Sequence, residues 1–160
     1  MTARDDILAA NEHYASTFGQ GGLQGAPTRR FAVVTCMDAR LDPARFLGLE
    51  EGDAHVIRNA GGLVTDDALR SLVISHHELG TQEAYVIGHE GCGMIGLSNE
   101  RLQMHLGPAA EGMDFLGFTD LDDAVRGSVR KIRESPLLPD TFGATGFVYD
   151  VRTGRLREVA

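Results

Sequence analysis

The sequence has no tryptophan, and only two of its 160 residues are cysteines. It contains no apolar run of the roughly 20 residues that a membrane-spanning helix needs, and its first residues lack the basic-then-apolar order of a signal peptide. No basic cluster stands out, and the formal net charge is −8. We therefore expect neither a nucleic-acid nor a membrane partner. A cytoplasmic location is expected, where two cysteines serve as metal ligands or reactive thiols more often than as a disulfide.

The length of the chain predicts a single domain over residues 1–160. Apolar residues follow a helical stripe over residues 4–18, and the segment that comes next, residues 19–27, is rich in glycine. We predict a helical arm and linker over residues 1–27 and an α/β core over residues 28–160. Such a linker lets the first helix pack on a partner subunit, although a local surface helix explains the same pattern.

Within the core, short apolar runs alternate with helical patterns. The predicted strands comprise residues 31–35, 54–58, 84–88, 144–151 and 156–159. The predicted helices begin at residues 43, 65, 92 and 121. This alternation predicts an α/β fold with a mostly parallel central sheet flanked by helices. The last two strands, on either side of a Thr-Gly turn, predict a C-terminal antiparallel hairpin or edge strand.

Two polar motifs follow two of these strands. Cys36, Asp38 and Arg40 come at the end of the first strand, and His89 and Cys92 follow the third strand. Because ligand sites in parallel sheets form beyond the carboxyl ends of the strands, the two motifs can meet there. Two thiolates and one imidazole provide three protein ligands for Zn²⁺. A fourth position is then left open, which is typical of catalytic zinc sites.

Asp38 and Arg40 fit the same interpretation. Asp38 can occupy the fourth position in a closed state of the site, or it can orient the group that does. Arg40 can hold Asp38 away from the metal through a bidentate ion pair. The helix predicted to begin at Cys92 is expected to stabilise a thiolate there. A cysteine on an apolar strand is usually a core residue, but the polar, glycine-containing loops around both cysteines favour a metal site.

Three segments of the chain resemble the β-class carbonic anhydrase family, and the short length resembles its compact prokaryotic members. The segments are residues 36–40, 52–62 and 87–93. The resemblance implies a parallel sheet and a dimeric unit with its active site near the dimer interface. It also implies exchange of the N-terminal helices between subunits, so we expect a homodimer or a dimer of dimers.

By this resemblance Cys36, His89 and Cys92 bind Zn²⁺, and Asp38 and Arg40 form the catalytic dyad. The implied reaction is the reversible hydration of carbon dioxide to bicarbonate and a proton, by attack of a zinc-bound hydroxide. The expected partner is therefore a small molecule, carbon dioxide or bicarbonate. The same scaffold also serves hydrolases of carbonyl sulfide and carbon disulfide, which are the alternative. A non-catalytic zinc or binding module is the third hypothesis.

Overall fold

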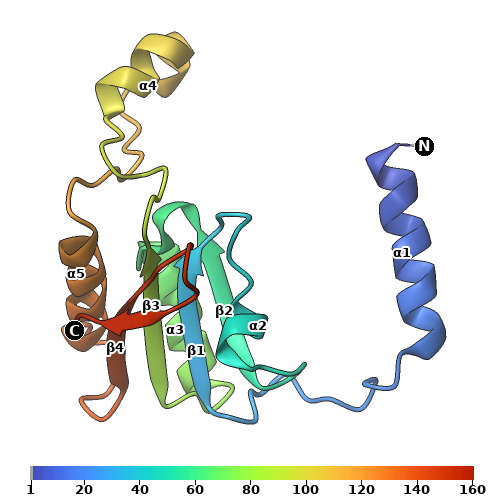
Figure 1. Cartoon of the computed structure of the whole chain (residues 1–160). Helices are drawn as coiled ribbons and strands as arrows, with labels where there is room; N and C mark the ends of the chain where they lie inside the picture. Colours follow the sequence, from blue (N-terminus) through green and yellow to red (C-terminus); the bar gives the residue numbers. More distant parts are fainter. Residues whose placement is uncertain (1) are drawn as a thin grey trace.

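The computed structural model describes residues 2–160, so residue 1 of the predicted arm lies outside the described residues. A five-stranded sheet with the order β2-β1-β3-β4-β5 forms its centre (Figure 1). The strands are β1 (Phe31–Cys36), β2 (Ala54–Asn59), β3 (Glu83–His89), β4 (Gly143–Tyr149) and β5 (Leu156–Glu158). Neighbouring strands from β2 to β4 are parallel, and β5 pairs antiparallel with β4. The predicted fold class and C-terminal hairpin are confirmed.

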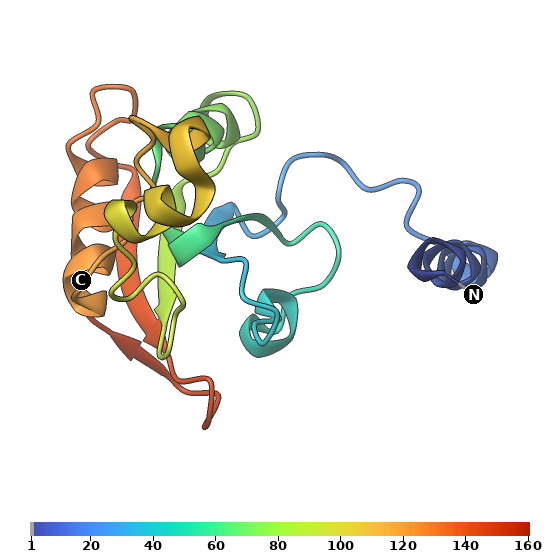
Figure 2. The same ribbon diagram turned by 90° about the horizontal axis from the view of Figure 1, so that it is seen from above.

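Helices cover both faces of this sheet (Figure 2). The helices are α1 (Ala3–Thr17), α2 (Pro43–Leu47), α3 (Asp66–His77), α4 (Asn99–Leu106) and α5 (Leu121–Arg133), with 3-10 turns η1 (Ala60–Gly62) and η2 (Gly107–Ala110). Side chains of α3 and α5 pack on one face of the sheet, and those of α2 pack on the other. Strand β1 is therefore buried along its whole length, which explains its uninterrupted apolar sequence.

The start of α3 follows from its sequence. The side chain of Thr65 accepts a hydrogen bond from the backbone N–H of Ala68, at 3.2 Å, and caps the helix as predicted. Asp66 and Asp67 lie in the first turn, where the helix dipole favours negative charge. The helix ends at His77, slightly before the predicted stop at Gly80.

The prediction of a helix beginning at Cys92 was wrong. Residues 92–97 form successive turns, and α4 begins only after Ser98, whose side chain caps it. Gly96, inside the predicted helix, adopts a positive φ angle of 74°, which is incompatible with a continuous right-handed helix, and Gly91 just before it has a φ of 64°. The pattern of apolar and glycine residues resembled a helix start, but the glycines serve to turn the chain.

Helix α1 lies apart from the sheet and the other helices (Figures 1 and 2). None of its residues is buried. Three of its large apolar side chains are exposed, namely Ile7, Leu8 and Tyr14. The side chain of Phe18, which directly follows the helix, is exposed as well. The Tyr14 hydroxyl donates a hydrogen bond to the Glu51 carboxylate. The division into an arm over residues 1–27 and a core over 28–160 stays a prediction. Among residues 2–160, no helix has both the length and the apolar character to cross a membrane.

Candidate metal centre

The carboxyl ends of β1 and β3 bring the two polar motifs together. Cys36 is the last residue of β1, His89 is the last residue of β3, and Cys92 lies in the turn after β3. All three side chains are buried, and their ligand atoms lie within 4.8 Å of one another. The strands themselves are neighbours in the sheet, with Thr35 directly opposite Ile87. This juxtaposition was expected from the positions of the two motifs at the carboxyl ends of parallel strands.

The two sulfur atoms are spaced as a tetrahedral zinc site requires. The Sγ atoms of Cys36 and Cys92 are 3.9 Å apart, and neither cysteine forms a disulfide. Two thiolates bound at about 2.3 Å in tetrahedral geometry lie about 3.8 Å apart. Each cysteine is 5% exposed, so both sulfurs are shielded from solvent. The donor set and its spacing fit Zn²⁺.

His89 is held in the tautomer that a metal ligand needs. Its Nδ1 lies 3.0 Å from the backbone oxygen of Glu90. A carbonyl can only accept, so Nδ1 carries the proton and the lone pair of Nε2 is free. Among the described residues, Nε2 of His89 is the one buried side-chain nitrogen or oxygen atom that has no hydrogen-bond partner. Burial lowers the pKa of His89, which favours the neutral form that binds metals.

Asp38 and Arg40 form a close ion pair beside this triad. The Nε and Nη2 atoms of Arg40 donate to the two carboxylate oxygens of Asp38, at 2.9 and 2.8 Å. The backbone N–H of Arg40 donates to the same carboxylate at 2.9 Å. These hydrogen bonds, from the side chain first, hold the pKa of Asp38 well below its usual range. One Asp38 oxygen lies 3.8 Å from Nε2 of His89, so an ionised carboxylate lies beside this ligand atom.

The electrostatics of Cys92 differ from the sequence-based expectation. Burial raises the pKa of its thiol, and the backbone N–H of Met94 lowers it to a smaller extent. Because no helix begins at Cys92, no helix dipole stabilises the thiolate. The nearby sulfur of Cys36 and the carboxylate of Asp38 raise the pKa of Cys92 further. A bound cation is therefore the natural partner that would hold both sulfurs as thiolates.

Arg58 positions the loop that carries Asp38, a role that the sequence analysis missed. Its Nε donates to the backbone oxygen of Cys36 at 2.9 Å, and its Nη2 donates to the backbone oxygen of Asp38 at 2.8 Å. Arg58 lies near the carboxyl end of β2, opposite Thr35 of β1. The sequence places a positively charged residue near the end of a strand. Only the folded structure shows that the backbone oxygens of Cys36 and Asp38 accept its hydrogen bonds.

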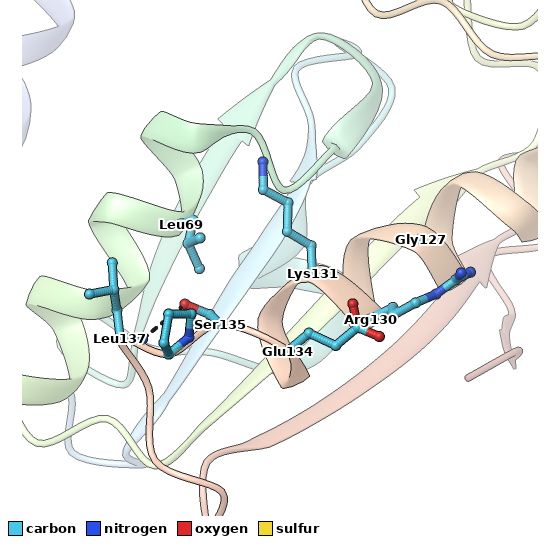
Figure 3. Close-up of a pocket in the computed structure, with 8 residues that line it drawn as sticks. Leu69, Gly127, Arg130, Lys131, Glu134, Ser135 and Leu137 are labelled. Atoms are coloured by element: carbon cyan, nitrogen blue, oxygen red, sulfur yellow. Dashed lines mark hydrogen bonds between the residues drawn. The ribbon is translucent and has the colours of Figure 1, made fainter.

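A surface hollow with a volume of about 640 Å³ lies between α3 and α5 (Figure 3). Leu69, Arg130, Glu134 and Leu137 are among its lining residues. Its lining includes none of the five predicted site residues. Lys131, also in the lining, donates to Asp66 at 2.7 Å. The hollow therefore provides no donor set comparable to that of the metal centre.

Comparisons with known proteins show which families and structures this chain resembles. The family description "Carbonic anhydrase" matches residues 31–116. Beta-carbonic anhydrase 1 of Mycobacterium tuberculosis is 43% identical, with 99% of each chain covered. The crystal structure of a carbonic anhydrase from Streptococcus mutans has a TM-score of 0.93 and 46% identity, covering 100% of this chain and 99% of the other. A carbon disulfide hydrolase from an Acidianus strain is 35% identical, covering 85% of this chain and 80% of its own.

Proposed function

This chain belongs to the β-carbonic anhydrase family, and from that membership we propose that it is a lyase that reversibly hydrates carbon dioxide to bicarbonate and a proton. The observation that carries the proposal is the buried set of Cys36, His89 and Cys92 beside the ionised Asp38. The chemistry that Zn²⁺ supplies when bound to such a set is the acidification of water, which provides a nucleophile near neutral pH.

Asp38 is proposed to orient the nucleophile. An ionised carboxylate can only accept hydrogen bonds, so a water or hydroxide beside Asp38 must direct its proton there. A lone pair of that oxygen is then left for the carbon of carbon dioxide. The low pKa of Asp38 keeps the carboxylate an acceptor throughout the neutral range. Asp38 acts in this scheme through orientation, not as a general base.

Arg40 is proposed to keep Asp38 out of the fourth metal position. Its guanidinium binds both carboxylate oxygens of Asp38 and also donates to the backbone oxygen of Gly91 at 3.0 Å. Without these two hydrogen bonds to its carboxylate, Asp38 would be free to become the fourth ligand, which would give a closed site. The open position, and hence the reaction, depends on Arg40 in this scheme.

Metal analysis tests the ligand set. Wild-type protein is expected to bind one zinc per chain, and Cys36→Ser and Cys92→Ser variants are expected to lose most of it. Ser16→Ala, a change on the exposed α1, provides the control and should retain zinc. Full zinc occupancy in both cysteine variants would show that the ligand assignment is wrong.

Stopped-flow hydration assays test the reaction. We expect zinc-loaded protein to hydrate carbon dioxide faster than it hydrolyses carbonyl sulfide or carbon disulfide. The alternative activity has a specific motivation, because relatives named carbon disulfide hydrolase share 31–35% identity with this chain. Hydrolysis of the sulfur compounds without hydration of carbon dioxide would favour that alternative. Neither activity in zinc-loaded protein would favour a non-catalytic zinc module.

We also propose that the active protein is at least a homodimer. The apolar side chains of α1 are exposed in the single chain, and a partner subunit would cover them. Deletion of residues 1–18 should weaken association, whereas Met104→Ala, at another exposed apolar position, should not. A wild-type protein that sediments as a monomer at micromolar concentration would contradict the proposal. The two free thiols suit a reducing compartment, so the cytoplasm stays the proposed location.

A further inference from the structure

Phe118 packs against the buried cluster of Cys36, Leu41 and Cys92. It stands at the end of a long excursion of the chain, residues 97–117, which contains α4 and projects from the body of the protein (Figure 1). We propose that the Phe118 ring is a wall of the metal centre that shields the cysteine sulfurs and limits the size of substrate accepted beside them. The second part of this inference rests on the proposed function.

The backbone ties Phe118 to the turn that follows Cys92. The N–H of Gly96 donates to the Phe118 oxygen at 2.8 Å, and the N–H of Phe118 donates to the Met94 oxygen at 3.2 Å. A parallel bridge pairs Ile95 with Phe118. The same turn that presents the Cys92 sulfur therefore also positions the Phe118 ring.

Two glycines make room for this arrangement. A Cβ atom at Gly117 would lie only 1.9 Å from the Leu97 backbone oxygen, so the two ends of the excursion approach as closely as glycine permits. A Cβ at Gly61 would lie 3.2 Å from Cε1 of Phe118 and 3.3 Å from Cγ of Met94. The ring thus fills space that a side chain at Gly61 would otherwise occupy.

The rest of the excursion maintains its own structure. Helix α4 has no buried residue. The side chain of Asn99 donates to Asp114 at 3.0 Å and accepts from the backbone N–H of Phe115 at 2.9 Å. These contacts join the two arms of the excursion to each other rather than to the sheet. Phe118 is the point at which the excursion reaches the cysteine cluster.

An apolar ring in this place has two physical consequences. It excludes water from the sulfurs, and the apolar shell of a metal site controls solvent access and local dielectric. It also takes up volume, so truncation to alanine would leave a cavity beside the ligands. Carbonyl sulfide and carbon disulfide are larger than carbon dioxide because sulfur is larger than oxygen. Loss of the ring should therefore favour the sulfur compounds.

Alkylation of metal-free protein tests the shielding without any activity measurement. Iodoacetamide should modify Cys36 and Cys92 severalfold faster in Phe118→Ala than in wild type. Met113→Ala is the matched control, since Met113 belongs to the same excursion but is 57% exposed. Its alkylation rate should equal that of wild type. Equal rates in a folded Phe118→Ala protein would overturn the shielding.

Substrate preference tests the second part. In zinc-loaded Phe118→Ala, the ratio of kcat/KM for carbonyl sulfide to that for carbon dioxide should rise on the order of tenfold. Changes in the volume of an apolar pocket alter substrate preference by at least about this factor. Phe118→Leu should give an intermediate ratio, and it carries both measurements if the alanine variant does not fold. An unchanged ratio with an active wild type overturns this inference. An inactive wild type instead overturns the proposed function, while the alkylation rates still decide the shielding.

Discussion

Gly62→Ala is expected to damage the metal centre through its backbone. Gly62 has a φ of +66°, and a Cβ atom there would lie 2.8 Å from the backbone nitrogen of Cys36 and 2.9 Å from the carbonyl carbon of Thr35. Both atoms belong to β1, which is buried along its whole length and paired on both edges. These backbone atoms cannot move without displacing a predicted metal ligand.

The expected loss in the free energy of unfolding has two parts, and a second glycine allows one of them to be measured alone. A positive φ alone costs an alanine about 1–2 kcal/mol. Forcing a methyl group into a packed interior adds about 1–3 kcal/mol, so Gly62→Ala should lower the free energy of unfolding by about 2–5 kcal/mol. Gly48 provides the control, because its φ is +60° but a Cβ there would meet nothing within 4 Å. Gly48→Ala should therefore show only the first part.

Urea unfolding of both variants, with zinc content measured on the same samples, provides the assay. We expect Gly48→Ala to retain full zinc and Gly62→Ala to retain less, since the clash falls on the backbone of Cys36. If Gly62→Ala lowers the free energy of unfolding no more than Gly48→Ala does, the close approach of Gly62 to β1 is not the reason that this position requires glycine.

Changes at three further residues have defined outcomes. Arg40→Ala should keep its zinc but lose carbon dioxide hydration by orders of magnitude in stopped-flow assays, and Arg40→Lys should restore it only in part because an ammonium cannot form the fork that binds Asp38. Asp122 has a pKa lowered chiefly by its hydrogen bonds from Arg157, so this carboxylate stabilises the fold above its unfolded pKa and ceases to do so as the pH falls through its folded pKa. Asp122→Asn should accordingly lower Tm by about 1–2 °C at pH 7, and this difference should shrink as the pH falls through the folded pKa of Asp122, as calorimetry can check. Gly127→Ala should raise the free energy of unfolding in urea by about 0.4–1 kcal/mol, because Gly127 lies within α5 and an added Cβ there meets nothing within 4 Å.

The sheet and the convergence of the two motifs could be predicted because both follow from local patterns. The short apolar runs of β1 and β3 predicted strands, and their alternation with helices predicted a mostly parallel sheet. Parallel strands end at one edge, so Cys36 and His89 had to lie near each other if the strands were neighbours. The ion pair between Asp38 and Arg40 needed only their two-residue separation, and it is present.

The remaining parts of the site depend on contacts between distant segments. Nothing near Arg58 in the sequence indicates that its guanidinium binds the backbone oxygens of Cys36 and Asp38. The turn after Cys92 was mistaken for a helix, because the sequence alone does not say which glycines adopt positive φ. Phe118 packs against the cluster of Cys36, Leu41 and Cys92, and the point at which the chain returns to this cluster is fixed by backbone pairing between distant segments.

Two arginines, Arg40 and Arg58, connect the loops of the site to each other and to the end of β1. Cys36 and His89 are fixed by the sheet, but Asp38 and Cys92 lie beyond the strand ends. Arg58 binds the backbone of the first loop, and Arg40 connects the first loop to the second, since it donates to Asp38 and to the backbone oxygen of Gly91. Arg40 therefore links the carboxylate to the turn that carries the third ligand. A change at Arg40 should alter both the orientation of Asp38 and the spacing of the two loops, and the lysine variant, which keeps the charge but not the bidentate hydrogen bonds, shows how much of either effect the charge alone maintains.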